Sequence, residues 1–277
     1  MATLEIATRS ELLGQDIDVT VVTPAAPAPG YPAPAPAASR SAAEAVAAPS
    51  PAPHTPPAPP RPCYLLHGTS QNHRAWPTHV DLARLATRYH LAFVCMSAGR
   101  SFFLNWDRGL PWTDFITAEL PDLVAADVRL DLTPGAALIA GLSAGGYGAF
   151  HAALTRPDLY AAAGSFSGVL DIASAYNRPR RVELYRGAFA TDEVAGTDAD
   201  LMALASAHAV AGTALPRLWA ACGSSDHVLP QSHAFRDHAT ALGLPLTYVE
   251  WEGDHEWVFW VPALEEFLAW ALSDPAH

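Results

Sequence analysis

Hydrophobic positions recur with two different periods along the chain. Residues 16–23 alternate polar and apolar side chains, which predicts a strand with one exposed face. After residue 62, short apolar runs that are typical of buried parallel strands alternate with segments of helical period. The expected strands are 63–66, 91–96, 136–140, 160–166, 218–222 and 246–251, and the expected helices are 77–88, 114–127, 144–156, 230–242 and 257–272. This order predicts a mostly parallel, doubly wound α/β sheet with helices on both faces.

Two long segments interrupt this alternation. Residues 24–62 contain 14 of the 25 prolines together with 14 alanines, a composition typical of a polyproline-type tract. Expected strands flank this tract on both sides, so we interpret it as a flexible loop inserted into a single domain that spans 1–277. Its length adds about 2 kcal/mol to the cost of closing the loop. Residues 171–216 have no regular pattern and predict an irregular excursion, which either covers a site or is a solvated loop.

Charge narrows the range of functions. The chain carries 28 acidic and 16 basic side chains, for a net charge of -12, and every basic residue is arginine. The absence of lysine excludes Schiff-base chemistry, the phosphate-loop lysine and the serine–lysine dyad. An acidic balance without any basic run argues against nucleic acid or an anionic membrane as the main partner.

The cysteines and the chain's first residues bear on the compartment. Cys63, Cys95 and Cys222 have neither metal-ligand spacing nor the even number of a disulfide framework, and each lies in an expected strand. They are therefore expected to be buried, reduced thiols. The first residues lack the pattern of a signal peptide, and no apolar run reaches the ~18 residues that span a bilayer. We therefore expect a cytoplasmic protein.

The sharpest chemical signal is the run Gly141-Leu142-Ser143-Ala144-Gly145, which lies between an expected strand and an expected helix. A nucleophilic serine on such a turn needs small neighbours because the backbone folds tightly around it. The turn also directs the amide of Ala144 and the positive helix end toward the place where an oxyanion forms. We interpret Ser143 as a nucleophile, in preference to an incidental serine in a glycine-rich turn.

A serine nucleophile needs a base and an orienting carboxylate, which in this fold follow it in the order acid, then histidine. Asp226 follows the strand 218–222, and His255 follows the strand 246–251. Both side chains are therefore expected at the same sheet edge as Ser143. The sequence predicts a triad of Ser143, Asp226 and His255.

Several other residues compete for these roles. Asp171, which follows the strand 160–166, is the second choice for the acid, and Asp254 adjoins the base too closely to orient it. His227 is adjacent to the proposed acid and is expected to point away from it. His151, in the helix after the nucleophile, is expected to be a packing residue.

The remaining site residues are expected in two loops. The loop after the strand 63–66 reads His67-Gly68-Thr69-Ser70, and the amide of Thr69 is the expected second oxyanion donor. One such donor contributes roughly 3–4 kcal/mol to transition-state stabilisation. Phe102, Trp106 and Trp257 are candidate substrate-binding residues of a small apolar acyl pocket, with core packing as the alternative.

Further motifs follow one another in a recognisable order. They are Leu65-Leu66-His67-Gly68, Asn72-His73-x-x-Trp76, Met96-x-x-x-Arg100-Ser101-Phe102, Phe115-Ile116-x-x-Glu119-Leu120-Pro121, the serine run extended to Ala149, Ser165-Phe166-Ser167-Gly168, Cys222-Gly223-x-x-Asp226 and Gly253-x-His255-x-Trp257. Together they resemble the putative-esterase (esterase D-like) branch of the α/β-hydrolases, most of all its tributyrin esterase and acetyl esterase members. The resemblance implies a serine hydrolase for small acyl esters that uses neither cofactor nor metal, with Ser143, Asp226 and His255 in the triad positions.

The predicted function is a serine carboxylesterase that hydrolyses short-chain acyl esters through an acyl-enzyme. A thioesterase of the S-formylglutathione hydrolase kind, a feruloyl or acetylxylan-type esterase, and an acyltransferase are alternatives on the same fold. S-formylglutathione hydrolases carry a cysteine in the oxyanion loop, whereas this loop reads His-Gly-Thr-Ser-Gln, which weakens the thioesterase alternative. A non-catalytic binding module is disfavoured because a binder has no need of the complete Ser, Asp, His series. A small-molecule ester is the expected partner.

Overall fold

Eight strands form one sheet at the centre of the structure, a computed structural model that describes residues 2–25, 58–105, 109–176, 185, 189 and 193–273. The strands are β1 (Ala2–Ser10), β2 (Gln15–Thr23), β3 (Arg61–Leu66), β4 (Leu91–Met96), β5 (Ala137–Leu142), β6 (Tyr160–Phe166), β7 (Arg217–Gly223) and β8 (Leu246–Trp251). Their order across the sheet is β1-β2-β4-β3-β5-β6-β7-β8. The strands from β3 to β8 pair in parallel, whereas β1 with β2 and β2 with β4 pair antiparallel.

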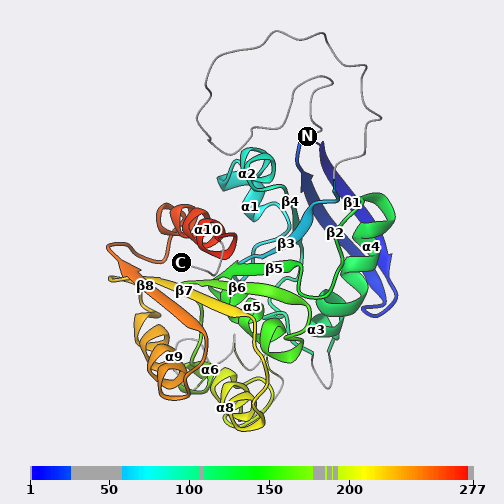
Figure 1. Ribbon diagram of the computed structural model, residues 1–277. Coiled ribbons are helices and arrows are strands. Elements are labelled where there is room, and N and C mark those ends of the chain that lie inside the picture. The colour runs from blue at the N-terminus through cyan, green and yellow to red at the C-terminus, as the bar shows by residue number, and fades with distance from the viewer. Residues whose placement is uncertain are drawn as a thin grey trace, which may run out of the picture.

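Helices cover both faces of this sheet (Figure 1). One face carries α1 (Ala75–His79), α2 (Leu82–Tyr89) and α10 (Trp257–Ala271). The other carries α3 (Trp112–Asp114), the π-helix η1 (Phe115–Glu119), α4 (Leu120–Asp127), α5 (Ala144–Thr155), α6 (Ile172–Tyr176), α8 (Leu201–Ala211) and α9 (Leu229–Ala241). Two apolar cores result, one around Phe93 and Phe267 and one around Phe115 and Phe150, and all four rings are fully buried.

The parallel part of the sheet agrees with the sequence prediction. Each strand expected after residue 62 is present, with its ends within two residues of the expected positions. The strand predicted at 16–23 is β2, which begins one residue earlier. The expected helix 77–88 is instead two helices, because the Asp81 side chain accepts a hydrogen bond from the Arg84 amide and starts α2 afresh.

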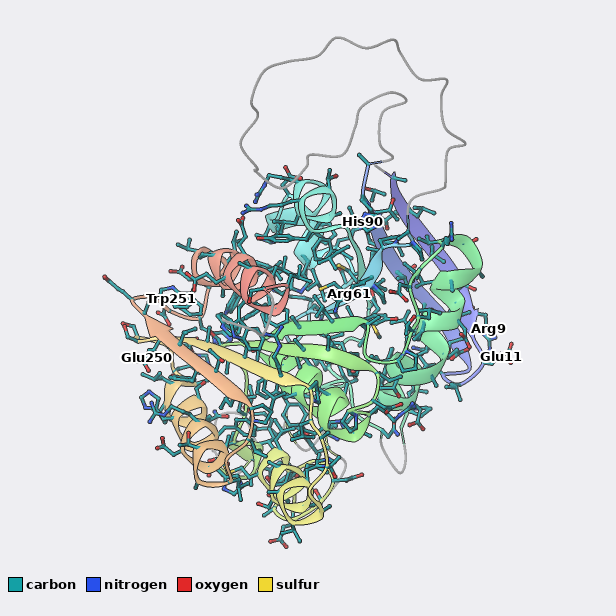
Figure 2. All side chains as sticks on the ribbon, viewed as in Figure 1. Arg9, Glu11, Arg61, His90, Glu250 and Trp251 are labelled. Atoms are coloured by element: carbon teal, nitrogen blue, oxygen red, sulfur yellow. The ribbon has the colours of Figure 1, made fainter. Side chains whose placement is uncertain are left out.

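Strand β1 is an element that the sequence pattern does not predict. It pairs with β2 along its whole length at one edge of the sheet, and Gly14 in the connecting turn has a φ of +62°. Its Leu4 and Ile6 are only half-buried between exposed neighbours. The other two inward positions, Thr8 and Ser10, are polar, so the hydrophobic signal of this strand is weak. Figure 2 shows the two sheet edges, with Arg9 and Glu11 beside the β1–β2 turn on one side and Glu250 and Trp251 of β8 on the other.

The prediction that residues 171–216 are irregular is wrong for α6 and α8. Asp200 caps α8 by accepting hydrogen bonds from the amides of Met202 and Ala203, and Gly212 ends the helix with a φ of 66°. Leu201 and Ala205 bury this helix against the rest of the protein. Most of the remaining side chains in α8 are small or apolar, so no helical period stands out in its sequence.

The proline- and alanine-rich tract connects two strands of the same sheet. Both β2, before the tract, and β3, after it, pair with β4, so the two strands lie on either side of β4 in one sheet. The last two residues assigned to the tract, Arg61 and Pro62, belong to β3. Residues 26–57 lie outside the described part of the chain.

Two further predictions can be compared with the structure. Cys63, Cys95 and Cys222 are buried and free, as expected from their places in strands. Within the described ranges, no helix is long and apolar enough to cross a membrane.

Candidate active site

Ser143 lies on a tight turn between the end of β5 and the start of α5. Its backbone angles are φ 54° and ψ −116°, a combination that a non-glycine residue adopts only under constraint from its surroundings. The flanking glycines make the turn possible. A Cβ on Gly141 would lie 2.3 Å from the carbonyl oxygen of Gly145, and one on Gly145 would lie 2.4 Å from that of Leu66.

A chain of hydrogen bonds joins Ser143 to the two other residues predicted for the triad. Asp226 follows β7 and His255 follows β8, so all three stand at the carboxyl ends of parallel strands. The distance between His255 Nε2 and Ser143 Oγ is 3.0 Å, and His255 Nδ1 lies 3.0 and 2.9 Å from the two carboxylate oxygens of Asp226. In the neutral ring, Nδ1–H donates to the carboxylate and Nε2 accepts from the serine hydroxyl.

The protein holds Asp226 in its charged form. The residue is 4% exposed, and its Oδ1 also accepts a hydrogen bond of 2.9 Å from the amide of Val228. Burial alone raises the pKa of this carboxyl, but the hydrogen bond and the positive charge of His255, together with the Val228 amide, lower the pKa by more than burial raises it. The pKa of Asp226 is therefore below its ordinary value of 3.8.

The other acidic candidates are engaged elsewhere. The Asp171 carboxylate accepts a hydrogen bond from the amide of Ser174 at the start of α6. The Asp254 carboxylate accepts one of 2.7 Å from the amide of His255 itself, and so braces the backbone of that residue. Neither bond involves the His255 ring, whereas Asp226 contacts its Nδ1.

The expectation that His227 points away from Asp226 is wrong. Its Nδ1 lies 3.3 Å from Asp226 Oδ1, and its ring centroid lies 4.5 Å from that of His255. The turn after β7 brings the side chain of residue 227 back over the carboxylate, which neighbouring positions in an extended strand do not allow. Sequence adjacency alone gave no signal of this contact.

The expected oxyanion loop lies directly against the nucleophile. A Cβ on Gly68 would be 3.6 Å from the Cβ of Ser143, and the half-buried Thr69 follows in the chain. The side-chain oxygen of Gln71 accepts a hydrogen bond of 2.9 Å from the Gly68 amide. Ala144, the residue expected to supply the other amide, is 3% exposed at the first position of α5.

His67 braces this loop through both ring nitrogens, a role that sequence reasoning missed. Its Nε2 accepts a hydrogen bond of 3.0 Å from the Ala98 amide, so Nδ1–H donates to the carbonyl oxygen of Gly68 at 2.7 Å. The ring is 1% exposed, and burial lowers its pKa from 6.5 to about 4. It therefore stays neutral at pH 7. The only available signal was the His-Gly pair itself.

The three aromatic residues expected to bind substrate lie in different surroundings. Phe102 is 2% exposed, and its ring packs against Tyr147 and Phe189 in an aromatic cluster. Trp257 is half-buried and stacks on His79 with a centroid distance of 3.9 Å. Trp106 lies outside the described residues.

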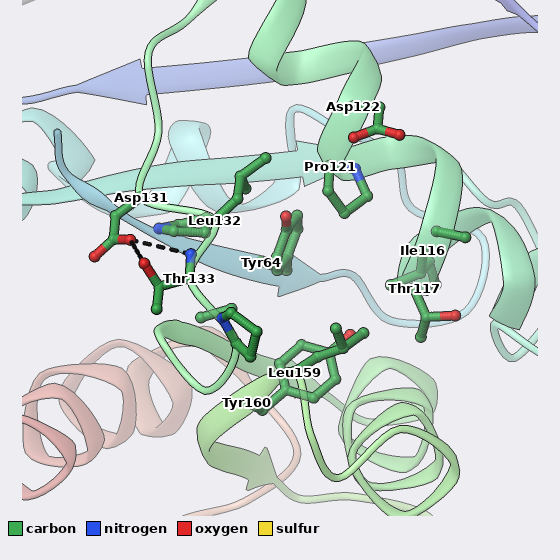
Figure 3. A pocket seen from close by; sticks show the side chains of 14 residues that line it. Tyr64, Ile116, Thr117, Pro121, Asp122, Asp131, Leu132, Thr133, Leu159 and Tyr160 are labelled. Atoms are coloured by element: carbon green, nitrogen blue, oxygen red, sulfur yellow. Dashed lines mark hydrogen bonds between the residues drawn. The ribbon is translucent and has the colours of Figure 1, made fainter.

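An apolar cavity of about 210 Å³ lies at the amino ends of the parallel strands, away from the carboxyl ends that carry Ser143, Asp226 and His255 (Figure 3). Its walls include Pro62, Ala137 and Tyr160, which stand at the amino ends of β3, β5 and β6, and Tyr64 also lines it. In open α/β sheets ligands bind at the carboxyl ends of the strands. This cavity is therefore separate from the site around Ser143.

The strand order, the parallel register and the serine turn define an α/β-hydrolase fold, as the sequence predicts, and solved structures of this class are similar to the chain. FphF, a fluorophosphonate-binding serine hydrolase of Staphylococcus aureus, has a TM-score of 0.83 and 23% identity over 99% of each chain. The S-formylglutathione hydrolase FrmB of Staphylococcus aureus has a TM-score of 0.79 and 23% identity over 98% of this chain and 99% of its own.

The chain belongs to the putative esterase family, whose model matches residues 45–271. An acetyl esterase of Caldicellulosiruptor saccharolyticus is 25% identical over 219 residues, which are 75% of this chain and 81% of that protein. The MPT51/MPB51 antigen of Mycobacterium bovis is 43% identical over 72 residues, only 25% of this chain and 23% of the antigen. The expected family is thereby confirmed, and the protein is an enzyme of the esterase class.

Proposed function

We propose that the protein is a carboxylesterase in which Ser143 attacks short-chain acyl esters, with His255 as base and Asp226 as the orienting acid. The observation that carries the proposal is the unbroken chain of hydrogen bonds from Ser143 through His255 to the buried carboxylate. An isolated serine hydroxyl is a weak nucleophile. A neutral imidazole within hydrogen-bond distance removes that obstacle because it accepts the proton as the new bond forms.

Acylation follows from these positions. His255 Nε2 takes the hydroxyl proton while Ser143 Oγ adds to the ester carbonyl, and Asp226 stabilises the resulting imidazolium. The amides of Thr69 and Ala144 are the proposed donors to the oxyanion. Collapse of the tetrahedral intermediate breaks the bond to the alcohol, which leaves with the proton from His255 Nε2. An acyl-enzyme on Ser143 results.

Deacylation repeats the same steps with water. His255 Nε2 removes a proton from a water molecule, the hydroxide adds to the acyl carbonyl, and the bond to Ser143 Oγ breaks. The serine oxygen recovers its proton from His255, and the carboxylic acid leaves. The cycle consumes one ester and one water and releases one alcohol and one acid. The three side chains and two backbone amides named above suffice for it.

The preference for a short acyl chain rests on the relative that is an acetyl esterase and on the crowded surroundings of the base. The ring of Trp260 meets the His255 ring edge-on at 5.0 Å and is 5% exposed. Trp257 packs against Trp260, and Trp76 packs against the far side of this pair, on Trp257. Bulky indole rings on this side restrict the space beside the base. We therefore propose small acyl groups as substrates.

Kinetics with 4-nitrophenyl esters of increasing acyl length test the proposal. We expect the highest kcat/KM for acyl groups of about two to four carbons, and an initial burst of nitrophenol equal to the enzyme concentration if deacylation is slow. Ser143→Ala is expected to abolish both. A higher kcat/KM for a feruloyl ester or an S-formyl thioester, or transfer to an added alcohol in preference to water, would instead favour one of the alternatives on this fold.

A further inference from the structure

The carboxylate of the triad has two histidines against it. Asp226 Oδ1 lies 3.0 Å from Nδ1 of His255 and 3.3 Å from Nδ1 of His227. The two imidazole rings meet at 65° with their centroids 4.5 Å apart. A triad requires only one of these histidines, so the second ring has no part in the chemistry described above.

These side chains bring three potential metal-binding atoms close together. One carboxylate oxygen and one nitrogen from each ring all lie within 4.8 Å of one another. Zinc bonds to nitrogen and to carboxylate oxygen are about 2.0–2.2 Å long, so the ligand atoms of a tetrahedral zinc ion lie about 3.3 Å apart. The two contacts of Asp226 Oδ1, at 3.0 and 3.3 Å, are close to this spacing. Two imidazole nitrogens with one carboxylate oxygen form a ligand set that suits zinc. Magnesium and calcium prefer oxygen ligands, so this ligand set does not suit them.

We propose that Asp226, His227 and His255 form a zinc site that inhibits the enzyme. The inference rests on the proposed function, because it assigns a regulator to the same histidine that serves as base. The zinc ion is here an inhibitor and not a cofactor.

Inhibition follows from where the imidazole proton goes. In the active form, His255 carries its single proton on Nδ1 and leaves the Nε2 lone pair free for the Ser143 proton. A zinc ion on Nδ1 takes the place of that proton, so the proton of the neutral ring moves to Nε2. Nε2–H is a donor and no longer accepts a proton from Ser143. No bond to Ser143 is made or broken, yet its base is lost.

The site is open to an ion from solvent on one side. The His227 side chain is 48% exposed and that of His255 is 21% exposed, whereas the carboxylate beneath them is 0% exposed. The net charge of -12 also attracts a divalent cation to the protein. His227 is the most exposed of the three proposed ligands. It is also the one ligand that a catalytic triad does not need, so its replacement tests the zinc site separately from the triad.

Calorimetric titration of zinc chloride into the untagged Ser143→Ala protein, stripped of metal, tests binding without reference to activity. We expect one zinc ion per chain, at least ~10-fold weaker binding in Ser143→Ala/His227→Asn, and no binding of magnesium. His233→Asn in the Ser143→Ala background is the matched control, because His233 is also partly exposed and pairs with a carboxylate, Glu250, at 2.6 Å. This control is expected to bind zinc as tightly as its parent.

Inhibition of the active enzyme is measured next, with each variant's rate expressed relative to its own rate in a chelator. We expect zinc to lower kcat with Ser143 intact, and the His227→Asn variant to need at least ~10-fold more zinc for half-inhibition. Zinc should also slow fluorophosphonate labelling of Ser143. If zinc does not bind, or binds equally in His227→Asn, the inference is overturned while the proposed esterase stands. If zinc binds as expected but Ser143→Ala still hydrolyses esters, the proposed function fails instead.

Discussion

The backbone of Ser143 is the most constrained feature of the site, and its two glycine neighbours permit it. A side chain at Gly145 would place a Cβ 2.4 Å from the carbonyl oxygen of Leu66, which is backbone of the central strand β3 and cannot move aside. The absence of a side chain at this position is therefore part of the proposed catalytic geometry. The residue that follows β3 belongs to the proposed oxyanion loop, so a displacement at Gly145 is expected to disturb that loop as well as Ser143.

Replacing Gly145 by alanine is expected to lower both stability and activity. Forcing an extra methyl group into closed packing costs about 1–3 kcal/mol, and the shifted turn misplaces Ser143 so that kcat/KM falls at least ~100-fold. Urea unfolding and ester hydrolysis measure the two effects. Gly212→Ala is the control, since Gly212 has a φ of +66° but no atom within 4 Å of the place where the alanine methyl group would lie. It should lose about 1 kcal/mol and keep its activity.

Buried neutral histidines make stability depend on pH. Burial lowers the pKa of His67, and likewise that of His151, from 6.5 to about 4. Between these values the unfolded chain binds more protons than the native protein, so stability falls as the pH drops from 6.5 to 4. A full shift of this size corresponds to about 3 kcal/mol for each histidine.

We expect His67→Gln to flatten this dependence, because glutamine does not titrate. Urea unfolding of wild type and variant at several pH values between 7 and 4 checks the difference in slope. At pH 7 the variant is less stable and less active, because His67 hydrogen-bonds to both Gly68 and Ala98. Parallel slopes for the two proteins would contradict the assignment of His67 as a buried, neutral group.

At the residue scale, sequence order predicted that Ser143, Asp226 and His255 lie close together, because each stands just after a recognisable strand, and their side chains are joined by hydrogen bonds in the structure. Their catalytic roles stay a proposal. The order of residues along the chain did not predict the hydrogen bonds of His67 or the contact between His227 and Asp226. They depend on the direction in which a loop turns and on the side-chain rotamer, and neither leaves a periodic signal. For His227 the sequence argument, which treated adjacent residues as pointing apart, led to the wrong expectation.

At the scale of elements, apolar runs in the sequence predicted the strands that are buried on both faces. They did not predict elements whose apolar positions are few or do not stand out from their neighbours. Strands β4 and β6 match their predicted bounds, since each is a short apolar segment that is buried almost throughout. The edge strand β8 also matches its predicted bounds, although it is only half-buried. Strand β1 alternates exposed and half-buried positions, but only two residues on its inward face, Leu4 and Ile6, are large and apolar. Helix α8 is rich in alanine, so both elements give a weak hydrophobic signal. In α8 the cap residues carry more information than the hydrophobic pattern.

The cap of α8 gives a prediction at this scale. Asp200 accepts hydrogen bonds from the amides of Met202 and Ala203 at the helix start and from Gly196. Asp200→Ala is expected to lower the free energy of unfolding by about 1–2 kcal/mol, and Asp200→Ser to lose less, because serine is also a good cap. Urea denaturation compares the three proteins. Equal stability of wild type and Asp200→Ala would mean that this cap does not hold the helix.

At the scale of the whole molecule, the sheet joins segments on both sides of the proline- and alanine-rich tract. β2 precedes the tract and β3 follows it, and β4 pairs with both. We therefore propose that the chain on either side of the tract forms one catalytic domain. The sequence predicts this arrangement because strand patterns flank the tract, but it assigns no role to the tract itself.

Replacing residues 26–57 by a Gly/Ser linker of about ten residues tests the one-domain proposal. The triad and the oxyanion loop lie outside this segment, so we expect kcat/KM for a short-chain ester to stay within about twofold of wild type. The shorter loop should raise the free energy of unfolding by about 1 kcal/mol. Loss of folding or of activity would show that the segment belongs to the structure of the site.

The central claim is that Ser143 is a nucleophile activated by His255. Reaction with a fluorophosphonate, followed by mass spectrometry of the intact protein and of its peptides, tests this most directly. We expect one adduct per chain on Ser143, no adduct in Ser143→Ala, and labelling at least ~100-fold slower in His255→Asn. A label on another residue, or an equal rate in His255→Asn, would contradict the account.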